Sequence, residues 1–328
     1  MKKKHNMFRI FAVMFLMITA IFAVACNNKP EAAGQEANLN IAYQYGMAYA
    51  PLMVMKEQGL IEKHYGQEVT ITWQVLNSGA AINEGMTAGS IDIGAMGVAP
   101  AVTGVMNGVP YKIFSGLSSQ PHGIMTNVES IQSLSDITDD MKIALVNIGS
   151  IQHILLSMAS ENELGDAHAL DHNIQAMSHP DGMTALVSGS VECQLTTSPY
   201  LFREAEYDNL HMISSIEEVW PNGNTFIVGM ASTTLYEDNP ELYHAVVAAM
   251  DEAIVYLNEN KEAAAEMLCG NENVTKEVML EWLSDPACGY SPKLQGVMDM
   301  AQFMTDNGFI PKGPADIADI AYDNVEGK

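Results

Sequence analysis

Basic side chains are scarce in this chain of 328 residues. Fifteen Lys and Arg stand against 40 Asp and Glu, which gives a formal net charge of −25. Arginine occurs only at Arg9 and Arg203. A surface with this charge repels phosphate backbones, so we expect no nucleic-acid partner.

Cysteine is also rare, and the chain contains only four, without a C-x-x-C pair. This excludes a disulfide scaffold and gives no indication of a zinc ribbon or a thioredoxin-type redox site. Only 17% of the residues are charged and 48% are hydrophobic, which excludes a disordered acidic chain and is enough for two domains with apolar cores.

The common catalytic motifs are absent: there is no H-E-x-x-H, no G-x-S-x-G and no P-loop. His168 and His172 flank Asp171 and could approach a metal ion, but their position between a helix and a strand favours an exposed turn. We therefore expect no metal, no cofactor and no catalytic residues.

The first 26 residues form a separate signal. Lys2, Lys3, Lys4 and Arg9 precede an apolar run over residues 10–25 that only Thr19 interrupts. As a helix this run spans about 24 Å, less than the ~30 Å hydrocarbon core of a membrane. It therefore predicts a signal peptide of residues 1–25 and extracytoplasmic location.

Cys26 directly follows the small residues that precede the predicted cleavage site. This arrangement resembles a bacterial lipobox, in which the cysteine is acylated and anchors the protein to the membrane. The alternative is an ordinary signal peptide that leaves Cys26 as a free thiol. The polar residues that follow predict a flexible tether over residues 26–37.

Beyond the tether, strand and helix patterns alternate. The sequence predicts a strand over residues 40–44, a helix over 51–65 that begins with Pro51, and a strand over 69–76. Such alternation is typical of parallel sheets with helical crossovers.

The pattern occurs twice along the chain. Gly-Ser-Ile-Asp at residues 89–92 has a counterpart, Gly-Ser-Val-Glu, at residues 189–192, and a Gly-Met-Thr-Ala segment precedes both. The common order predicts two α/β lobes, although two lobes could also converge on one pattern. A strand pattern at residues 224–231 and helices after residue 240 follow, and we expect these helices to return to the first lobe. The predicted boundaries are residues 38–122 with 228–328 for lobe 1 and 123–227 for lobe 2, joined by two hinge crossings.

Several segments resemble a known family. Residues 43–62 (YQYGMAYAPLMVMKEQGLIE), 89–94 (GSIDIG), 108–111 (GVPY), 149–156 (GSIQHILL) and 179–186 (HPDGMTAL) are similar to the solute-binding proteins of nitrate, sulfonate, taurine and thiamine-precursor ABC importers. The resemblance covers roughly residues 38 to 325. It implies a type II periplasmic-binding fold, closure of the lobes around one solute, and delivery to an ABC permease with its ATPases.

Ligands of open α/β sheets bind beyond the carboxyl ends of the strands, and two facing lobes enclose a cleft lined by those ends. This rule selects the predicted ligand-binding residues, which are Gln44, Tyr45, Tyr49, Met96, Gly97, Ser118, Gly149, Ser150, Gln152, Thr196, Thr197 and Asn224.

Gly149 and Ser150 begin a predicted helix, whose N-terminal N–H groups suit a carboxylate, a sulfonate or another electron-rich group. Ser150 could instead only cap that helix. Tyr45 and Tyr49 could form walls for a planar solute or pack within the lobe. Arg203 is predicted to form local ion pairs with Glu204 and Glu206, so we expect a pocket without an arginine clamp.

Three functions fit these observations. The first is a monomeric, lipid-anchored receptor of an importer, which performs no chemistry and captures a small organic solute, either a sulfonate- or taurine-like compound or a pyrimidine or aromatic compound. The second is a solute-sensing surface protein without a transporter. The third is a pyrimidine-forming enzyme of the thiamine-precursor branch, which the missing cysteine cluster disfavours.

Outside the cytoplasm, Cys269 and Cys288 could form a disulfide.

Overall fold

The computed structural model describes residues 37–325, apart from the side chains of residues 214 and 215. The predicted signal peptide, the predicted lipid attachment at Cys26 and residues 26–36 of the predicted tether lie outside the described residues. None of the helices between residues 37 and 325 is long and apolar enough to cross a membrane.

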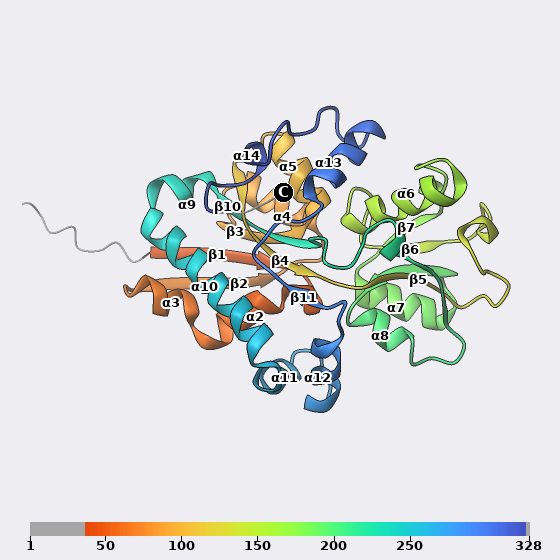
Figure 1. The fold of residues 1–328 in the computed structure, drawn as a ribbon, viewed down its shortest axis with the longest axis horizontal. Coiled ribbons are helices and arrows are strands. Elements are labelled where there is room, and N and C mark those ends of the chain that lie inside the picture. Colours follow the sequence, from red (N-terminus) through yellow and green to blue (C-terminus); the bar gives the residue numbers. More distant parts are fainter. Residues whose placement is uncertain (1–36, 326–328) are drawn as a thin grey trace, which may run out of the picture. The chain divides into compact units, whose positions relative to one another are not determined.

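Two β-sheets organise the described chain (Figure 1). The first has the strand order β11-β4-β10-β3-β1-β2 and the second the order β7-β6-β8-β5-β9. We call each sheet with its helices the first lobe and the second lobe. The strands of the first sheet are β1 (Ala37–Tyr43), β2 (Val69–Val75), β3 (Ile93–Gly97), β4 (Tyr111–Ser119), β10 (Ile227–Ser232) and β11 (Gly289–Tyr290). Those of the second are β5 (His122–Thr126), β6 (Ile143–Leu145), β7 (Ile174–Ala176), β8 (Cys193–Thr197) and β9 (His211–Ser215).

The chain crosses between the sheets twice, once between β4 and β5 and once between β9 and β10. Parallel pairs occur in both sheets, as the alternating pattern predicted, and they are β1–β3, β6–β7 and β6–β8. The returning strand β10 runs antiparallel between β3 and β4, so it completes the first sheet from the far end of the chain.

Helices cover both faces of the first sheet (Figure 1). One group contains α2 (Ala50–Gln58), α3 (Leu60–Tyr65) and α10 (Pro240–Glu259), which pack on one another. The other contains α4 (Gly79–Thr87), α5 (Val98–Met106), α13 (Val297–Asp306) and the short α14 (Ile317–Ile320). The remaining helices are α9 (Thr233–Asp238), α11 (Lys261–Leu268) and α12 (Lys276–Ser284).

The second lobe carries α6 (Ile151–Leu164), α7 (His179–Ser188) and α8 (Tyr200–Glu204). Its sheet and helices bury an apolar core that includes Met125, Leu186 and Val191. Short 3₁₀ turns complete the chain at Met47–Tyr49, Leu134–Asp136, Asp171–Asn173 and Ile216–Glu218.

Local sequence explains where several elements end. The predicted helix over residues 51–65 is two helices, because Gly59 adopts a left-handed conformation (φ 59°) that ends α2 before α3 begins. Serines with extended backbone cap α4, α6 and α7, each accepting a hydrogen bond from an N–H in the first turn; they are Ser78, Ser150 and Ser178.

The possible disulfide between Cys269 and Cys288 is not formed, and both are free thiols. Cys269 lies at the end of α11, where its Sγ donates a hydrogen bond to the Glu266 carbonyl of its own helix. Cys288 is buried before β11, and burial raises the pKa of its thiol to about 12. Cys193 is buried in β8.

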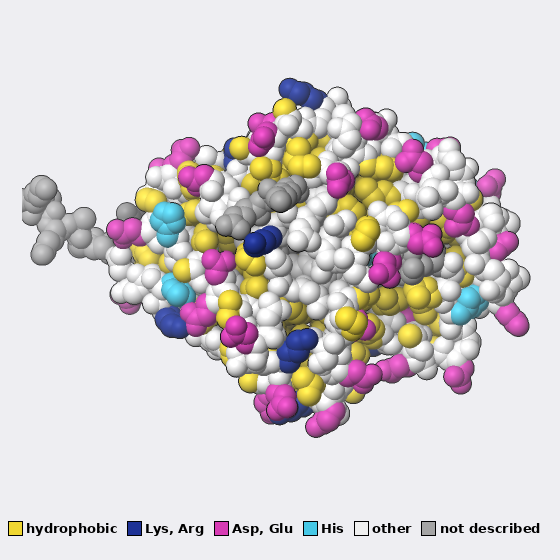
Figure 2. Space-filling model, in the orientation of Figure 1, with side chains coloured by type: hydrophobic (Ala, Val, Ile, Leu, Met, Phe, Trp, Pro, Cys, Tyr) yellow, Lys and Arg dark blue, Asp and Glu magenta, His cyan; other side chains and the backbone are white. Residues whose placement is uncertain are grey.

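Acidic side chains spread over both lobes of the face seen in Figure 2, with few basic ones between them. This distribution fits the excess of 40 acidic over 15 basic residues. The charge therefore does not come from one acidic patch on that face.

Candidate functional site

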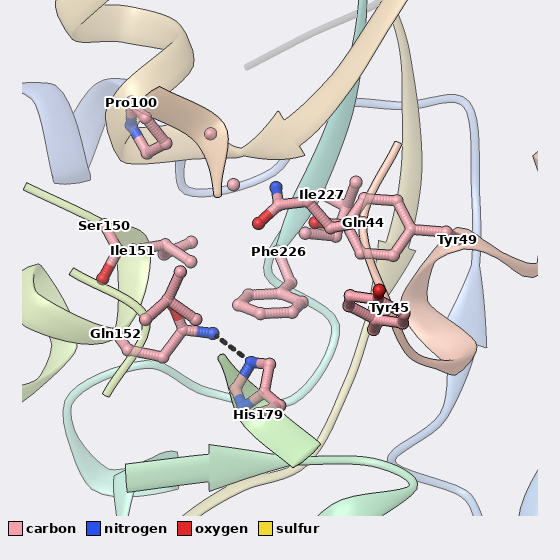
Figure 3. Close-up of a pocket in the computed structure, with 13 residues that line it drawn as sticks. Gln44, Tyr45, Tyr49, Pro100, Ser150, Ile151, Gln152, His179, Phe226 and Ile227 are labelled. Atoms are coloured by element: carbon pink, nitrogen blue, oxygen red, sulfur yellow. Dashed lines mark hydrogen bonds between the residues drawn. The ribbon is translucent and has the colours of Figure 1, made fainter. Parts of the chain in front are cut away.

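A pocket lies between the two lobes, and its empty volume is about 330 Å³, open solvent included (Figure 3). In the close-up, Gln44, Tyr45 and Tyr49 face Ser150, Ile151 and Gln152 across this space. The complete lining is Gln44, Tyr45, Tyr49, Gly79, Gly97, Pro100, Val146, Ser150, Ile151, Gln152, His179, Phe226 and Ile227. None of these residues is Asp, Glu, Lys or Arg.

Four helices begin at this pocket, two from each lobe. Gly79 is the first residue of α4 and Gly97 precedes α5, while Ser150 precedes α6 and His179 is the first residue of α7. The first N–H groups of a helix have no intrahelical partner and carry a partial positive charge. The helix starts therefore contribute partial positive charge at the pocket, although its lining contains no charged side chain.

His179 is the one histidine of the pocket lining. Its Nε2 lies 3.1 Å from Gln152 Nε2, and with the Gln152 amide as donor this ring nitrogen accepts and the proton sits on Nδ1. Nδ1 itself is buried and has no hydrogen-bond partner among the described residues. Burial lowers the pKa of His179 to about 4, so the imidazole is neutral at pH 7.

A second buried histidine stands behind the first. His122 in β5 packs edge-on against the pocket residue Phe226, with ring centroids 4.2 Å apart. Burial, together with the neighbouring His179, lowers the pKa of His122 to about 3. Both imidazoles therefore act as neutral hydrogen-bonding groups and not as cations.

The lobes touch at the pocket. Gly97 of the first lobe lies so close to Ile151 of the second that an added Cβ would come within 2.5 Å of Ile151 Cγ2. Gly46 stands against the second lobe in the same way, because a Cβ added there would lie 3.3 Å from the Ser198 carbonyl oxygen. Only a residue without a side chain fits the Gly97 position in this closed arrangement.

Beyond the pocket rim, the lobes also meet at His168. Its Nε2 lies 2.9 Å from the carbonyl oxygen of Asn307, which directly follows α13. Its Nδ1 lies 2.8 Å from Asp171, whose other carboxylate oxygen lies 3.0 Å from His153. The Asn307 carbonyl, followed by Asp171, raises the pKa of His168. His168 therefore does not occupy a free turn.

Six of the residues predicted from the sequence line the pocket, and they are Gln44, Tyr45, Tyr49, Gly97, Ser150 and Gln152. Ser150 serves two purposes, because its Oγ also accepts the His153 N–H and caps α6. Tyr45 is 44% exposed and stands at the mouth, whereas Tyr49 is buried.

The other six predicted residues lie outside the lining. Ser118 Oγ donates to the Ala48 carbonyl and Thr197 Oγ1 to the Pro121 carbonyl, so each joins two backbone segments. Met96 and Thr196 are fully buried. Asn224 packs beside Gly296.

Gly149, one of these six residues, was predicted to bind solute at the start of a helix. Its N–H donates to His153 Nδ1 at 3.0 Å, so this amide already has a partner and is not offered to a solute. Its φ of 80° explains the glycine by backbone geometry alone.

The sequence reasoning missed seven lining residues: Gly79, Pro100, Val146, Ile151, His179, Phe226 and Ile227. The Ser-Gly pair at residues 78 and 79 follows β2 and carried the same helix-start signal as Ser150. Phe226 and Ile227 gave no signal, because they enter the pocket on the return crossing.

Among residues 37–325, no three His, Cys, Asp or Glu side chains lie close enough together to hold a metal ion. His172 Nε2 instead lies 3.1 Å from Asp139 in an exposed pair.

Comparisons with known proteins place this chain among solute-binding relatives by sequence and by fold. A Bacillus subtilis (strain 168) protein assigned as an aliphatic sulfonates-binding protein is 24% identical over 274 residues, which are 81% of this chain and 80% of that protein.

Two solved structures share the fold. The alkanesulfonate-binding protein SsuA of Xanthomonas axonopodis pv. citri, bound to MOPS, superposes with a TM-score of 0.72 at 18% identity, covering 90% of this chain and 100% of that one. The periplasmic nitrate-binding protein NrtA of Synechocystis PCC 6803 superposes with a TM-score of 0.71 at 16% identity, covering 89% and 86%. The predicted periplasmic-binding fold of two α/β lobes is thereby confirmed.

The model of the NMT1-like family matches residues 32–269, which is more than half of the chain. The match includes every residue that lines the pocket. The chain belongs to the NMT1-like family.

Proposed function

We propose that this chain is the extracytoplasmic solute-binding component of an ABC importer, which captures a small organic solute between its lobes. The observation that carries the proposal is the pocket at which four helix N-termini from two lobes converge. Relatives whose names state sulfonate or nitrate binding share its fold. Closure without chemistry is the mechanism, with the crossings β4–β5 and β9–β10 as the hinge.

The solute presents a compact anionic or electron-rich group, such as a sulfonate, to the helix N-termini. No lysine or arginine lines the pocket, so N–H groups and the amides of Gln44 and Gln152 hold this group. Tyr45, Tyr49 and Phe226 provide aromatic surface for the organic part. The enclosed part of this pocket is only about 20 Å³, room for about one water molecule, so an organic solute enters when the lobes are further apart.

Binding fits this lining better than catalysis does. Ser150 Oγ accepts the His153 N–H as a helix cap and does not face an imidazole nitrogen as an activated serine would. His179 and His122 stay neutral at pH 7 because burial lowers their pKa values. The hydrogen bond to His179 instead fixes the Gln152 amide at the pocket, where it suits recognition of an electron-rich atom.

The cellular setting is part of the proposal. The apolar run over residues 10–25 directs export, and acylation of Cys26 anchors the receptor beside the permease. The receptor works as a monomer and passes its solute to the permease and its ATPases.

A titration with defined probes tests the solute class. Thermal shifts with ethanesulfonate, taurine, MOPS, nitrate and a neutral pyrimidine identify candidates, and calorimetry then gives their affinities. We expect stabilisation by at least one sulfonate and none by nitrate alone, because nitrate has no organic part for the aromatic surface. Stabilisation by the pyrimidine and by no sulfonate would contradict the proposed anionic group.

A further inference from the structure

Arg203 crosses from the second lobe to the first. In α8 it was predicted to pair locally with Glu204 and Glu206, but its Nη2 donates instead to the Glu272 carbonyl at 2.6 Å and to Glu272 Oε2 at 3.2 Å. Glu272 lies between α11 and α12. This segment belongs to the first lobe, since α11 packs on α2 and the chain runs on into β11.

Aromatic contacts surround the same guanidinium group. It lies 5.4 Å from the ring centroid of Trp282 in α12 and 5.8 Å from that of Tyr200 in α8. Phe202 stacks on Trp282 at 6.0 Å with an interplanar angle of 29°. The charged and the aromatic contact therefore tie α8 to the same part of the first lobe.

Tyr200 continues this arrangement into the pocket. Its ring stacks on His179 with centroids 5.5 Å apart and an interplanar angle of 13°. His179, Tyr200, Arg203 and Trp282 thus form a continuous row of stacked groups from the pocket lining to α12.

We propose that Arg203 is a positioning residue for solute binding: it latches the second lobe to Glu272 and Trp282 when the lobes close and, through Tyr200, fixes His179 beneath the solute. The inference rests on the proposed closure around a solute. Arg203 does not touch the pocket itself, so it acts only through these neighbours.

The burial of the contact favours such a latch. The Arg203 side chain is 27% exposed and that of Glu272 only 11%, so closure withdraws both charges from water. Burial raises the pKa of Glu272, and Arg203 opposes this rise. One hydrogen bond goes to the Glu272 carbonyl oxygen, and this bond does not depend on the carboxylate. The Arg203 contacts therefore form in the closed arrangement only, and in the solute-free protein, which samples both arrangements, they shift the population towards the closed one.

Four variants of the full chain test the latch. Arg203→Ala removes every contact, Arg203→Lys keeps the charge without the planar fork, and Glu272→Gln removes only the carboxylate. Lys63→Ala is the matched control, because it removes one cation from an exposed pair with Glu252 inside the first lobe. Circular dichroism establishes that each variant is folded.

Solution scattering without any solute and stopped-flow binding of ethanesulfonate are the two measurements. For Arg203→Ala we expect a larger radius of gyration and a dissociation rate raised about tenfold, with the association rate within a factor of about three of the parent, since a latch acts after encounter. Arg203→Lys and Glu272→Gln should fall between this variant and Lys63→Ala.

The proposal is overturned when Arg203→Ala matches Lys63→Ala in both the scattering profile and the dissociation rate. It is equally overturned when the association rate alone falls, because that result indicates steering and not a latch. Failure of ethanesulfonate to bind the parent protein would contradict the proposed solute class, whereas the solute-free scattering profiles would still decide on the latch.

Discussion

The polar side chains in this pocket are uncharged and act as hydrogen-bonding groups. Gln152 and His179 are joined by a hydrogen bond inside the lining, and the ring stays neutral because burial lowers its pKa to about 4. The partial charges come from the backbone at four helix starts. Solute recognition therefore depends on where N–H groups and amides point.

Gln152→Ala tests this dependence. We expect weaker solute binding, by up to about tenfold, because the loss of one neutral hydrogen bond costs ~0.5–1.5 kcal/mol. Calorimetry with the solute identified by thermal shift measures the change. Gln132→Ala removes an exposed glutamine of the second lobe and should leave the affinity as it is; equal affinities for the two variants would remove Gln152 from the site.

The burial of Glu204 predicts how the stability of the protein depends on pH. Both its carboxylate oxygens are buried without a hydrogen-bond partner among residues 37–325, and burial raises its pKa to about 8. The folded protein thus keeps a proton that the unfolded chain releases near pH 4.5. This contribution to stability is fully present below pH 4.5 and is lost as the pH rises through 8.

Glu204→Gln cannot ionise, so we expect it to be more stable than the parent at pH 8, by at least about 1.4 kcal/mol, the equivalent of one pKa unit. Urea unfolding of both proteins at pH 5 and pH 8 measures this difference. If the stability of the parent relative to the variant does not decrease from pH 5 to pH 8, Glu204 ionises normally.

At the scale of elements, the rule that ligands lie beyond the carboxyl ends of strands found half of the site. It succeeded at Gln44 after β1, at Gly97 at the end of β3 and at Ser150 before α6. It failed at Met96 and Thr196, because alternate side chains of a strand point to opposite faces and these two are buried.

The rule could not identify residues on the return crossing from the second lobe to the first. Phe226 and Ile227 reach the pocket through β10, which runs antiparallel to β3 and enters the sheet from a distant part of the sequence. Likewise, Arg203 was assigned to local partners because pairing at helical spacing is visible in the sequence, whereas its contact with Glu272 depends on how α12 returns.

Gly97 allows a direct test at this scale. Its backbone (φ −57°, ψ 151°) suits any residue, but a Cβ there would lie 2.5 Å from Ile151 Cγ2 of the other lobe. Gly97→Ala should therefore keep the melting temperature of the solute-free protein and weaken solute binding at least about tenfold, the equivalent of ~1.4 kcal/mol.

Gly270→Ala is the control for Gly97→Ala, since a Cβ at Gly270 meets no atom within 4 Å. Binding by Gly97→Ala as tight as by this control would mean that the lobes do not approach at Gly97 in the bound state.

For the whole molecule, a net charge of −25 surrounds a pocket at which four helix N-termini meet. The surface repels an anionic solute at long range, while the helix N-termini attract it only within the site. Salt screens the repulsion between distant charges more than the interactions inside a closed pocket.

The association rate constant of ethanesulfonate should therefore rise when the salt concentration increases from about 10 mM to about 150 mM, as the Debye length falls from ~30 to ~8 Å. Stopped-flow measurements of both rate constants test this sign. An association rate that falls with added salt would indicate a cationic entrance that Figure 2 does not display on the face it shows.

The proposed function depends on closure of the two lobes around one solute, and solution scattering with and without saturating solute measures this closure. The solute and its saturation are established beforehand by calorimetry. We expect a smaller radius of gyration for the bound protein, because the hinge crossings let β1–β4 and β5–β9 approach. Identical scattering profiles for the free and the saturated protein would contradict it.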